Sequence, residues 1–284
     1  MRDSPRKARL VTTPGEHTFA AKLLMETTVK KIHLALLVGL LVFSISSMAR
    51  ARGIGLKFAA TDPDAATSSL APAEVAGVIP QANWNNLEGA TGTNVGSLEA
   101  HNGAASTATV TWSSPNTWRS TTGNNAFPAG PDRKLVAGYL DSNNTAAGGV
   151  NITVNNIDAA FRAPAYDVYV YLLGDSGENR GGGYTVTSGA QSVLRYGSTL
   201  AMPTGYVLDP GTDADNSVDG NYLRFRNFRG ASVTITSNTE LTTPNGFRAP
   251  INAIQIVAVP EPASVVIACG LALVGTLACR RRRM

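Results

Sequence analysis

The chain of 284 residues is 43% hydrophobic and 15% charged, and its formal net charge of +4 comes from its two ends. Residues 1–51 hold eight Lys/Arg against three Asp/Glu and residues 280–283 are four arginines, so residues 52–279 carry 12 basic and 17 acidic side chains, a net charge of −5. An acidic body does not attract a phosphate backbone over long range, which argues against a nucleic-acid partner.

The N-terminal region has the three-part layout of a secretory signal peptide. Two lysines precede an apolar run at residues 32–45, and Ala49 and Ala51 follow as an Ala-x-Ala site for signal peptidase. The apolar run is short for a membrane span, so cleavage is the favoured interpretation and an uncleaved anchor is the alternative. Residues 1–51 form the predicted signal-peptide region, and because its first 24 residues are polar and basic we expect the true start at Met25.

A polar linker is predicted at residues 52–74, between the signal peptide and the folded body. From residue 57 onward it is rich in Ala, Thr, Ser, Asp and Pro, and such a segment has little apolar surface to bury. The folded body is then predicted at residues 75–258, a length typical of one domain with a sizeable core.

Period-two alternation of apolar and polar residues predicts a body made of strands, because successive side chains of a strand point to opposite faces. The strongest run is Tyr166–Leu173, whose two faces are both largely apolar, as in a central strand. The other predicted strands are residues 106–112, 150–154, 184–187, 192–196, 222–228, 232–236 and 251–259. Turns rich in Gly, Pro and Asn separate these short strands, so the predicted fold class is all-β, with a single jelly-roll-like β-sandwich preferred over a barrel.

The three tryptophans, Trp84, Trp112 and Trp118, are the candidate aromatic contacts for a ligand. An indole ring has a flat apolar face that can stack on the apolar face of a sugar. Trp112 shares a strand face with Val110 and is expected in the core. Trp84 and Trp118 lie among Asn, Ser and Thr, so they are candidate glycan-binding residues, with core or rim packing as the alternative.

An acidic stretch at residues 209–220 is a candidate calcium site. It holds Asp209, Asp213, Asp215 and Asp219, and calcium prefers several carboxylate and carbonyl oxygens on a flexible loop. The spacing does not match the helix-loop-helix calcium signature, so a solvated acidic loop is the alternative. No other cofactor is expected.

The body has few residues suited to catalysis. Both cysteines, Cys269 and Cys279, lie in the C-terminal apolar run, and His101 is the only histidine after residue 51. A cysteine nucleophile and a site with several histidine ligands are therefore excluded from the body, and a histidine triad would depend on His101. The glycine-rich run at residues 174–184 lacks the ordered phosphate-binding pattern and is predicted to be a flexible hairpin loop.

A carboxylate-dependent glycoside hydrolase stays open as an alternative. Such an enzyme needs only two opposed carboxyl groups. Glu88, Glu99, Glu178 and the aspartates supply candidates, but no sequence signature selects a pair. The absence of cysteine, the single histidine and the many small polar residues of the body favour a non-catalytic domain.

The C-terminal residues 259–284 carry the most specific signal in the chain. An extended motif comes first, an apolar run at residues 263–279 follows, and four arginines end the chain. A largely apolar run of 17 residues approaches the lower limit of a membrane-spanning helix, and arginines beside such a helix favour the cytoplasmic side. The motif residues are Val259, Pro260, Glu261, Pro262, Arg280, Arg281, Arg282 and Arg283.

This tail resembles the PEP-CTERM sorting signal of Gram-negative bacteria, in the order, spacing and position of its three parts. The resemblance covers under a tenth of the chain. It implies export through the inner membrane, transient anchoring in the membrane by the C-terminal helix, and processing by an exosortase. Signal peptidase, exosortase and the membrane are thus the implied partners, with exopolysaccharide as a further candidate because the family is commonly linked to it.

The body is also similar to a domain that recurs in exported, anchored proteins of planctomycetes and related bacteria. The residues that carry this similarity are 77–93, 109–118, 166–175 and 251–257. The similarity implies a galactose-binding-like jelly roll and no settled ligand. The expected function is that of an exosortase-sorted protein of the cell surface or extracellular matrix, with an exopolysaccharide-binding module and the hydrolase as alternatives.

Overall fold

The computed structural model describes residues 52–59, 69–120, 124–142, 149–175, 181–212, 219–238 and 248–260. These residues form 13 strands and two short helices, and the strands make sheets of five, six and two strands. The signal-peptide region and residues 261–284 lie outside the described residues. Among the helices that are described, none has the length and apolar character needed to cross a membrane.

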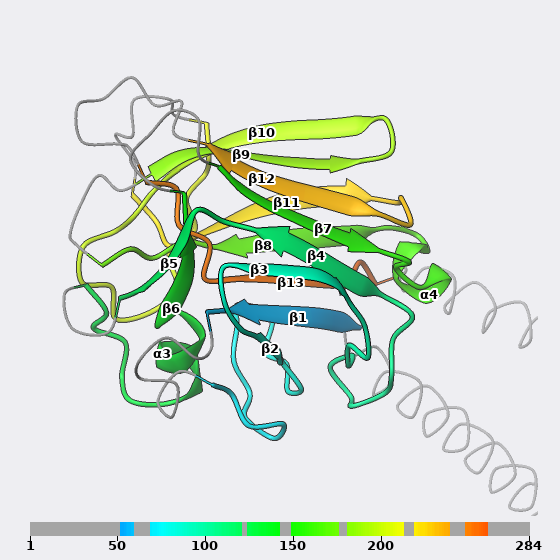
Figure 1. Cartoon of the computed structure of the whole chain (residues 1–284), viewed down its shortest axis with the longest axis horizontal. Coiled ribbons are helices and arrows are strands. Elements are labelled where there is room, and N and C mark those ends of the chain that lie inside the picture. The colour runs from blue at the N-terminus through cyan, green and yellow to red at the C-terminus, as the bar shows by residue number, and fades with distance from the viewer. Residues whose placement is uncertain are drawn as a thin grey trace, which may run out of the picture. The chain divides into compact units, whose positions relative to one another are not determined.

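The five-stranded sheet has the order β11-β8-β13-β1-β2 (Figure 1). Its neighbours are antiparallel except β1 and β2, which run parallel. The strands are β1 (Gly53–Phe58), β2 (Asn85–Leu87), β8 (Tyr166–Tyr171), β11 (Tyr222–Phe228) and β13 (Ala253–Ala258).

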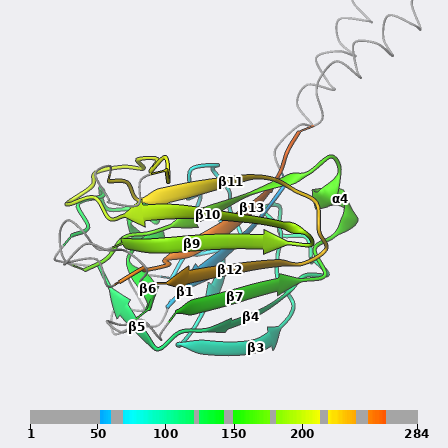
Figure 2. The same cartoon turned by 90° about the horizontal axis from the view of Figure 1, so that it is seen from above.

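The six-stranded sheet has the order β10-β9-β12-β7-β4-β3 and is antiparallel throughout (Figure 2). Its strands are β3 (Thr91–Val95), β4 (Thr109–Ser113), β7 (Val150–Asn155), β9 (Gly181–Ser188), β10 (Gln191–Ser198) and β12 (Val233–Asn238). The remaining elements are the pair β5 (Asn116–Arg119) and β6 (Gly138–Asp141) with helix α3 (Pro131–Leu135), and helix α4 (Ala159–Arg162). Helix α4 lies at the opposite end of the large sheets from β5, β6 and α3 (Figure 1).

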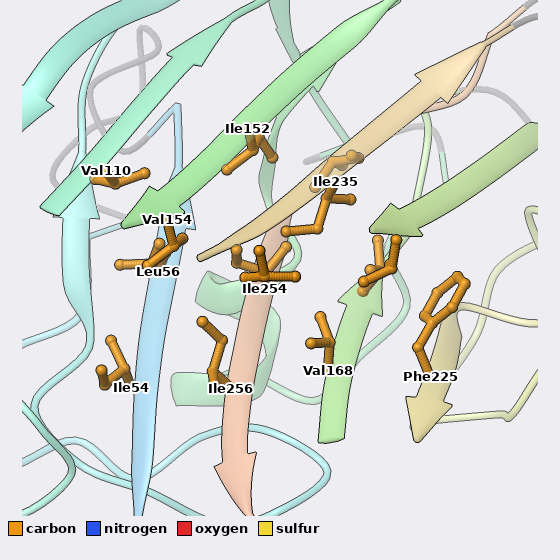
Figure 3. Packing of buried hydrophobic residues seen from close by; sticks show 14 of the residues in the cluster. Ile54, Leu56, Val110, Ile152, Val154, Val168, Phe225, Ile235, Ile254 and Ile256 are labelled. Atoms are coloured by element: carbon orange, nitrogen blue, oxygen red, sulfur yellow. The ribbon is translucent and has the colours of Figure 1, made fainter. Parts of the chain in front are cut away.

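The main core lies between the two large sheets, which pack face to face as a β-sandwich (Figure 3). Branched side chains from both sheets meet there and are fully buried, which stabilises the fold by about 1.5–3 kcal/mol for each large side chain. The residues labelled in Figure 3 are Ile54, Leu56, Val168, Phe225, Ile254 and Ile256 on one sheet and Val110, Ile152, Val154 and Ile235 on the other. The predicted all-β class is confirmed, and each of the eight predicted strands overlaps a strand of the structure.

The five-stranded sheet is buried on its outer face as well. Loops and helix α3 pack on this face in a second apolar cluster, which includes Trp84, Phe127 and Leu135 from the covering segments and Tyr169 and Tyr171 from β8. All six residues of β8 are buried as a result. The two-sided apolar pattern of that strand therefore predicted its central position correctly.

The first strand departs from the predicted linker. Residues 53–58 form β1, which pairs with β13 on one side and β2 on the other, and all six residues are buried. Only Ile54, Leu56 and Phe58 belong to the apolar core between the sheets. The alternate positions include Gly53 and Gly55, and a Cβ on Gly55 would overlap the Trp84 ring. Glycines at these positions let the covering loop approach the sheet closely. Because they have no side chain, they also interrupt the alternation of apolar and polar residues by which a strand is predicted.

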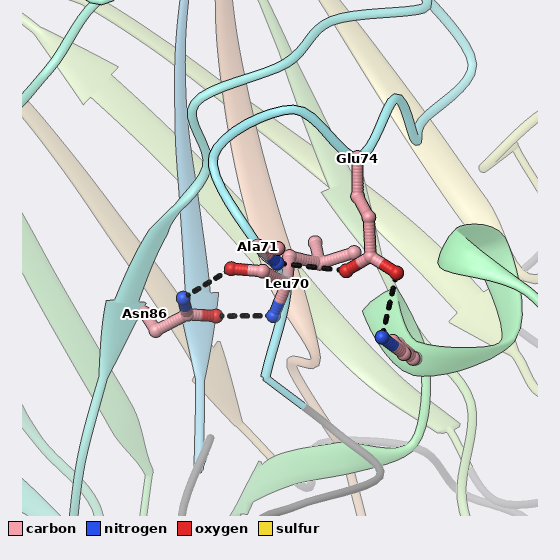
Figure 4. A network of polar contacts seen from close by, with 5 residues as sticks. Leu70, Ala71, Glu74 and Asn86 are labelled. Atoms are coloured by element: carbon pink, nitrogen blue, oxygen red, sulfur yellow. Dashed lines mark hydrogen bonds and ion pairs between the residues drawn. The ribbon is translucent and has the colours of Figure 1, made fainter.

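The second part of the predicted linker is likewise part of the fold (Figure 4). Asn86 exchanges two hydrogen bonds with the backbone of Leu70, at 3.0 and 2.9 Å. Glu74 accepts from the Ala71 N–H at 2.7 Å and from Lys134 Nζ at 2.6 Å. Residues 69–74 are thus connected to β2 and α3, and the folded body begins at β1 rather than at residue 75; residues 60–68 lie outside the described residues.

The glycine-rich run contains strand residues where a flexible loop was predicted. Gly181, Gly182 and Gly183 begin β9 and are buried. A Cβ on Gly181 would overlap the Gly197 carbonyl, and a Cβ on Gly182 would overlap the Asn238 carbonyl. Here glycine permits close approach of neighbouring strands rather than a turn. Residues 176–180 of the run lie outside the described residues.

Candidate functional site

Trp84, one of the two candidate glycan-binding tryptophans, is buried. Its side chain is 4% exposed, and its ring meets Tyr171 edge to face at 6.2 Å between centroids. Its Nε1–H donates to the carbonyls of Ala76 (3.2 Å) and Gln81 (3.1 Å). The indole therefore anchors the loop over the five-stranded sheet, and its face does not reach solvent for a sugar to stack on.

Trp118 differs, because 47% of it is exposed. It lies in β5 opposite Tyr139 of β6, next to the exposed Asn116 two residues earlier. Its ring is therefore accessible to a ligand, whereas the burial of Trp84 removes Trp84 from the candidate glycan-binding residues. Trp112 packs in the core against Phe58, as predicted.

The carboxylate of Asp209, from the candidate calcium loop, accepts hydrogen bonds from backbone N–H groups. Asp209 is 2% exposed, and its two carboxylate oxygens accept from the N–H groups of Ser198 (3.0 Å) and Gly211 (2.8 Å). Asp219 is partly buried, and Asp213 and Asp215 lie outside the described residues. Within the described ranges no group of three or more His, Cys, Asp or Glu side chains could hold a metal ion. The calcium site stays a prediction.

Other described carboxylates also have structural partners. Asp167 accepts from Arg224 at 2.6 and 2.9 Å, and Asp141 forms an ion pair with Arg248 at 3.1 Å. Asp132 accepts from the Gly77 N–H at 2.9 Å and from the Tyr206 hydroxyl at 2.8 Å. The side chains at positions 88 and 99 are exposed, and position 178 lies outside the described residues. These contacts assign Asp132, Asp141 and Asp167 to stabilising the fold.

Helix α4 and the loop before β4 enclose a cavity that the sequence did not predict. Its volume is about 290 Å³, and it opens to solvent. Arg52, His101, Asn102 and Asp158 supply polar groups, while Phe161 and four alanines supply an apolar surface. These residues come from three separate parts of the chain, and only the fold brings them together.

His101 connects the cavity to the start of β1. Its backbone N–H donates to the Gly53 carbonyl at 2.8 Å, and its Nδ1 accepts from the Gly53 N–H at 3.3 Å. An Nδ1 that accepts a hydrogen bond places the proton of the neutral ring on Nε2. His101 is thus a partly buried residue that positions the first strand.

Asp158 joins the cavity loop to α4. It accepts from Thr107 Oγ1 at 2.6 Å and from Ser106 Oγ at 2.8 Å. Burial opposes ionisation of this carboxyl, but the hydrogen bonds from Thr107 and Ser106 outweigh burial and lower its pKa. Asp158 is therefore ionised near neutral pH, and it lines the same cavity as the positively charged Arg52.

Comparison with known proteins identifies no family. No protein-family model matches the chain, and no curated protein matches it. Two crystal structures of exo-β-1,3-galactanase from Phanerochaete chrysosporium, one with galactose and one of a variant with β-1,3-galactotriose, are similar at 15% identity, with TM-scores of 0.25 and 0.24. The alignment covers 51% of this chain and 32% of each galactanase chain. Such values correspond to a partial overlap of structure and carry no functional argument.

Proposed function

We propose that the protein is exported, anchored transiently in the membrane and sorted by an exosortase to the cell surface or extracellular matrix, and that its sandwich is non-catalytic. The supporting observation is where the fold begins and ends. Strand β1 starts two residues after Ala51, and β13 ends at Ala258, directly before the Val259–Pro262 motif. Cleavage at both signals would therefore leave every described strand intact.

The two ends of the domain also lie side by side. The Ala258 N–H donates to the Arg52 carbonyl at 2.8 Å, which extends the β1–β13 ladder by one pair. Backbone pairing of this kind makes both ends of the domain resistant to fraying. The order of strands supports a jelly-roll-like sandwich, because from β7 onward the chain crosses repeatedly between the two large sheets.

Binding of exopolysaccharide is the second candidate function, and the outer face of the six-stranded sheet favours it. Thr111, Thr153, Thr234 and Thr187 lie in register across four neighbouring strands, all partly exposed. Neighbouring strands are about 4.8 Å apart, so the row presents regularly spaced hydroxyl groups without charge. Hydroxyl groups both donate and accept hydrogen bonds, which suits contact with a hydrated polysaccharide.

Cell fractionation with intact-mass analysis tests the export proposal. The full chain is produced in a bacterium that has an exosortase, and we expect a chain that starts at Arg52 and lacks the terminal arginines. Pro262→Ala should leave the tail attached, whereas Pro80→Ala, at an exposed position in the body, should be processed normally. Recovery of the unprocessed 284-residue chain from the cytosol would overturn the proposal.

A further inference from the structure

The cavity beside α4 combines an apolar floor with a polar rim, the arrangement that small-molecule sites share. Phe161 is 4% exposed and belongs to the main core, so the floor is part of the rigid sandwich. The volume of about 290 Å³ is at the lower end of the range for such sites and has room for about one sugar ring. Ala104 and Ala160 are small, exposed lining residues that leave the mouth open.

The rim is held in place before any ligand arrives. Within the loop, Gly103 N–H donates to the Ala100 carbonyl at 2.9 Å, and Ala104 N–H donates to Asn102 Oδ1 at 3.2 Å. Asn83 Nδ2 donates to the His101 carbonyl at 3.0 Å from a neighbouring loop. A rim already ordered by such bonds loses little conformational entropy on binding.

Arg52 gives the cavity a positive charge that can be offered to a ligand. Its carbonyl is bonded to β13, which fixes the backbone, while the residue is exposed at the cavity. Among the described residues, the ion pairs are Glu74–Lys134, Asp167–Arg224 and Asp141–Arg248, and none involves Arg52. Guanidinium groups bind carboxylates in a planar, two-bonded geometry.

We propose that this cavity binds one hexuronate unit, either as the free sugar acid or at the end of an acidic polysaccharide. Arg52 binds the carboxylate, Phe161 and the alanines contact the C–H face of the ring, and Asn102 Nδ2 and Asp158 bind hydroxyl groups. The inference rests on the proposed export, because such polymers lie outside the cell. It also names the ligand class for the polysaccharide-binding function.

Titration calorimetry of the exported, processed protein with galacturonate tests the site. We expect saturable one-to-one binding, and at least tenfold weaker binding of galactose, which lacks the carboxylate. Arg52→Gln should weaken galacturonate binding about tenfold, which corresponds to about 1.4 kcal/mol. Arg226→Gln, at an exposed arginine of β11 that does not line the cavity, should bind as the unaltered protein does.

A second variant blocks the cavity without changing its charge, so that the effect of the cavity's shape is tested apart from the effect of the Arg52 charge. Ala104→Phe places a ring in the cavity mouth and should abolish binding of both galacturonate and oligogalacturonate, with thermal unfolding used to verify the fold. Tighter binding of the oligomer would assign the ligand to a polymer end, and equal binding would assign it to the free sugar acid. Absence of saturable galacturonate binding, or binding that survives both cavity variants, would overturn the proposal. The intact mass of the protein shows whether it was processed, so a failure of export is distinguished from a failure to bind galacturonate.

Discussion

The two large sheets of the sandwich bury their outer faces to very different extents. The outer face of the five-stranded sheet is covered by loops and helix α3, whose apolar and aromatic side chains include Trp84, Phe127 and Leu135. The outer face of the six-stranded sheet presents partly exposed threonines such as Thr153 and Thr234. The inner faces of both sheets share one core. The outer face of the five-stranded sheet forms a second core, whereas that of the six-stranded sheet is a hydroxyl-bearing surface.

Trp84→Ala should produce the largest loss of stability, because it removes the ring that anchors the covering loop. We expect the free energy of unfolding to fall by about 3–5 kcal/mol, as for large-to-small changes in a core. Denaturant unfolding measures it. The matched control is Trp118→Ala, at a half-exposed position, which should cost under about 1 kcal/mol. Equal effects of the two changes would contradict the description of a second core.

The tyrosines of this second core predict a loss of stability at alkaline pH. Burial raises the pKa of the Tyr171 hydroxyl, and of Tyr169 and Tyr206, above the ordinary value near 10. The neutral phenol is thus favoured in the folded state, so its contribution is complete below pH 10 and is lost as the pH rises above 10. Each pH unit above 10 should cost about 1.4 kcal/mol for each of Tyr171 and Tyr206, whose hydroxyls are the more deeply buried.

Chemical denaturation at pH 8 and pH 11 measures this loss. Tyr171→Phe provides the comparison, because it removes one titrating group from the covered face and should flatten the decline. Stability that does not change up to pH 11 would show that these hydroxyls ionise without unfolding, and that the covered face is open to water.

The ion pair between Glu74 and Lys134 should contribute a smaller amount at the edge of the same covering layer. The hydrogen bond from Lys134 lowers the pKa of Glu74. The ionised form is therefore favoured in the folded state, and its contribution is present above the unfolded pKa and lost as the pH falls below it. Lys134→Met should cost about 0–1 kcal/mol at pH 7, with less effect in high salt. A cost that is unchanged at pH 3 would exclude the ion pair as its cause.

Substitutions on the outer face of the six-stranded sheet should change stability least. Thr234→Ala removes a partly exposed hydroxyl bonded to Thr153 at 3.1 Å, and we expect a change of about 0.5 kcal/mol or less. Ile235→Ala, one residue later on the same strand, points into the core and should cost about 2–5 kcal/mol. A large loss for the threonine variant would indicate that another part of the protein covers this face.

The sequence predicted the strands whose alternation is strong and missed those whose pattern is interrupted. β4 and β7 to β13 were predicted, whereas β1, β2, β3, β5 and β6 were not. In β1, Lys57 is fully buried with its Nζ donating to the Phe58 carbonyl at 2.9 Å. A lysine and two glycines do not suggest a buried strand, because their burial depends on the loop that covers them.

The candidate site shows the same limit. Among the singled-out residues, Trp84 and Asp209 have structural roles, and Trp118 stays exposed. These candidates were chosen by residue type alone. Whether an indole or a carboxylate is buried or exposed depends on contacts with segments far away in the sequence. The cavity lined by Arg52, His101 and Asp158 could not be predicted for the same reason, because these residues are far apart in the sequence and form no recognisable motif.

The sequence by itself determined the β-class of the body and the core face of its patterned strands, because side-chain alternation is a local property of the backbone. It also predicts a sorting signal and a signal peptide, and both stay predictions because their residues lie outside the described ranges apart from Val259 and Pro260. Only the tertiary structure decided that β1 belongs to the sandwich, that one outer face is covered, and that Arg52, His101 and Asp158 line one cavity. Those outcomes depend on contacts between residues far apart in the chain, which no local pattern specifies.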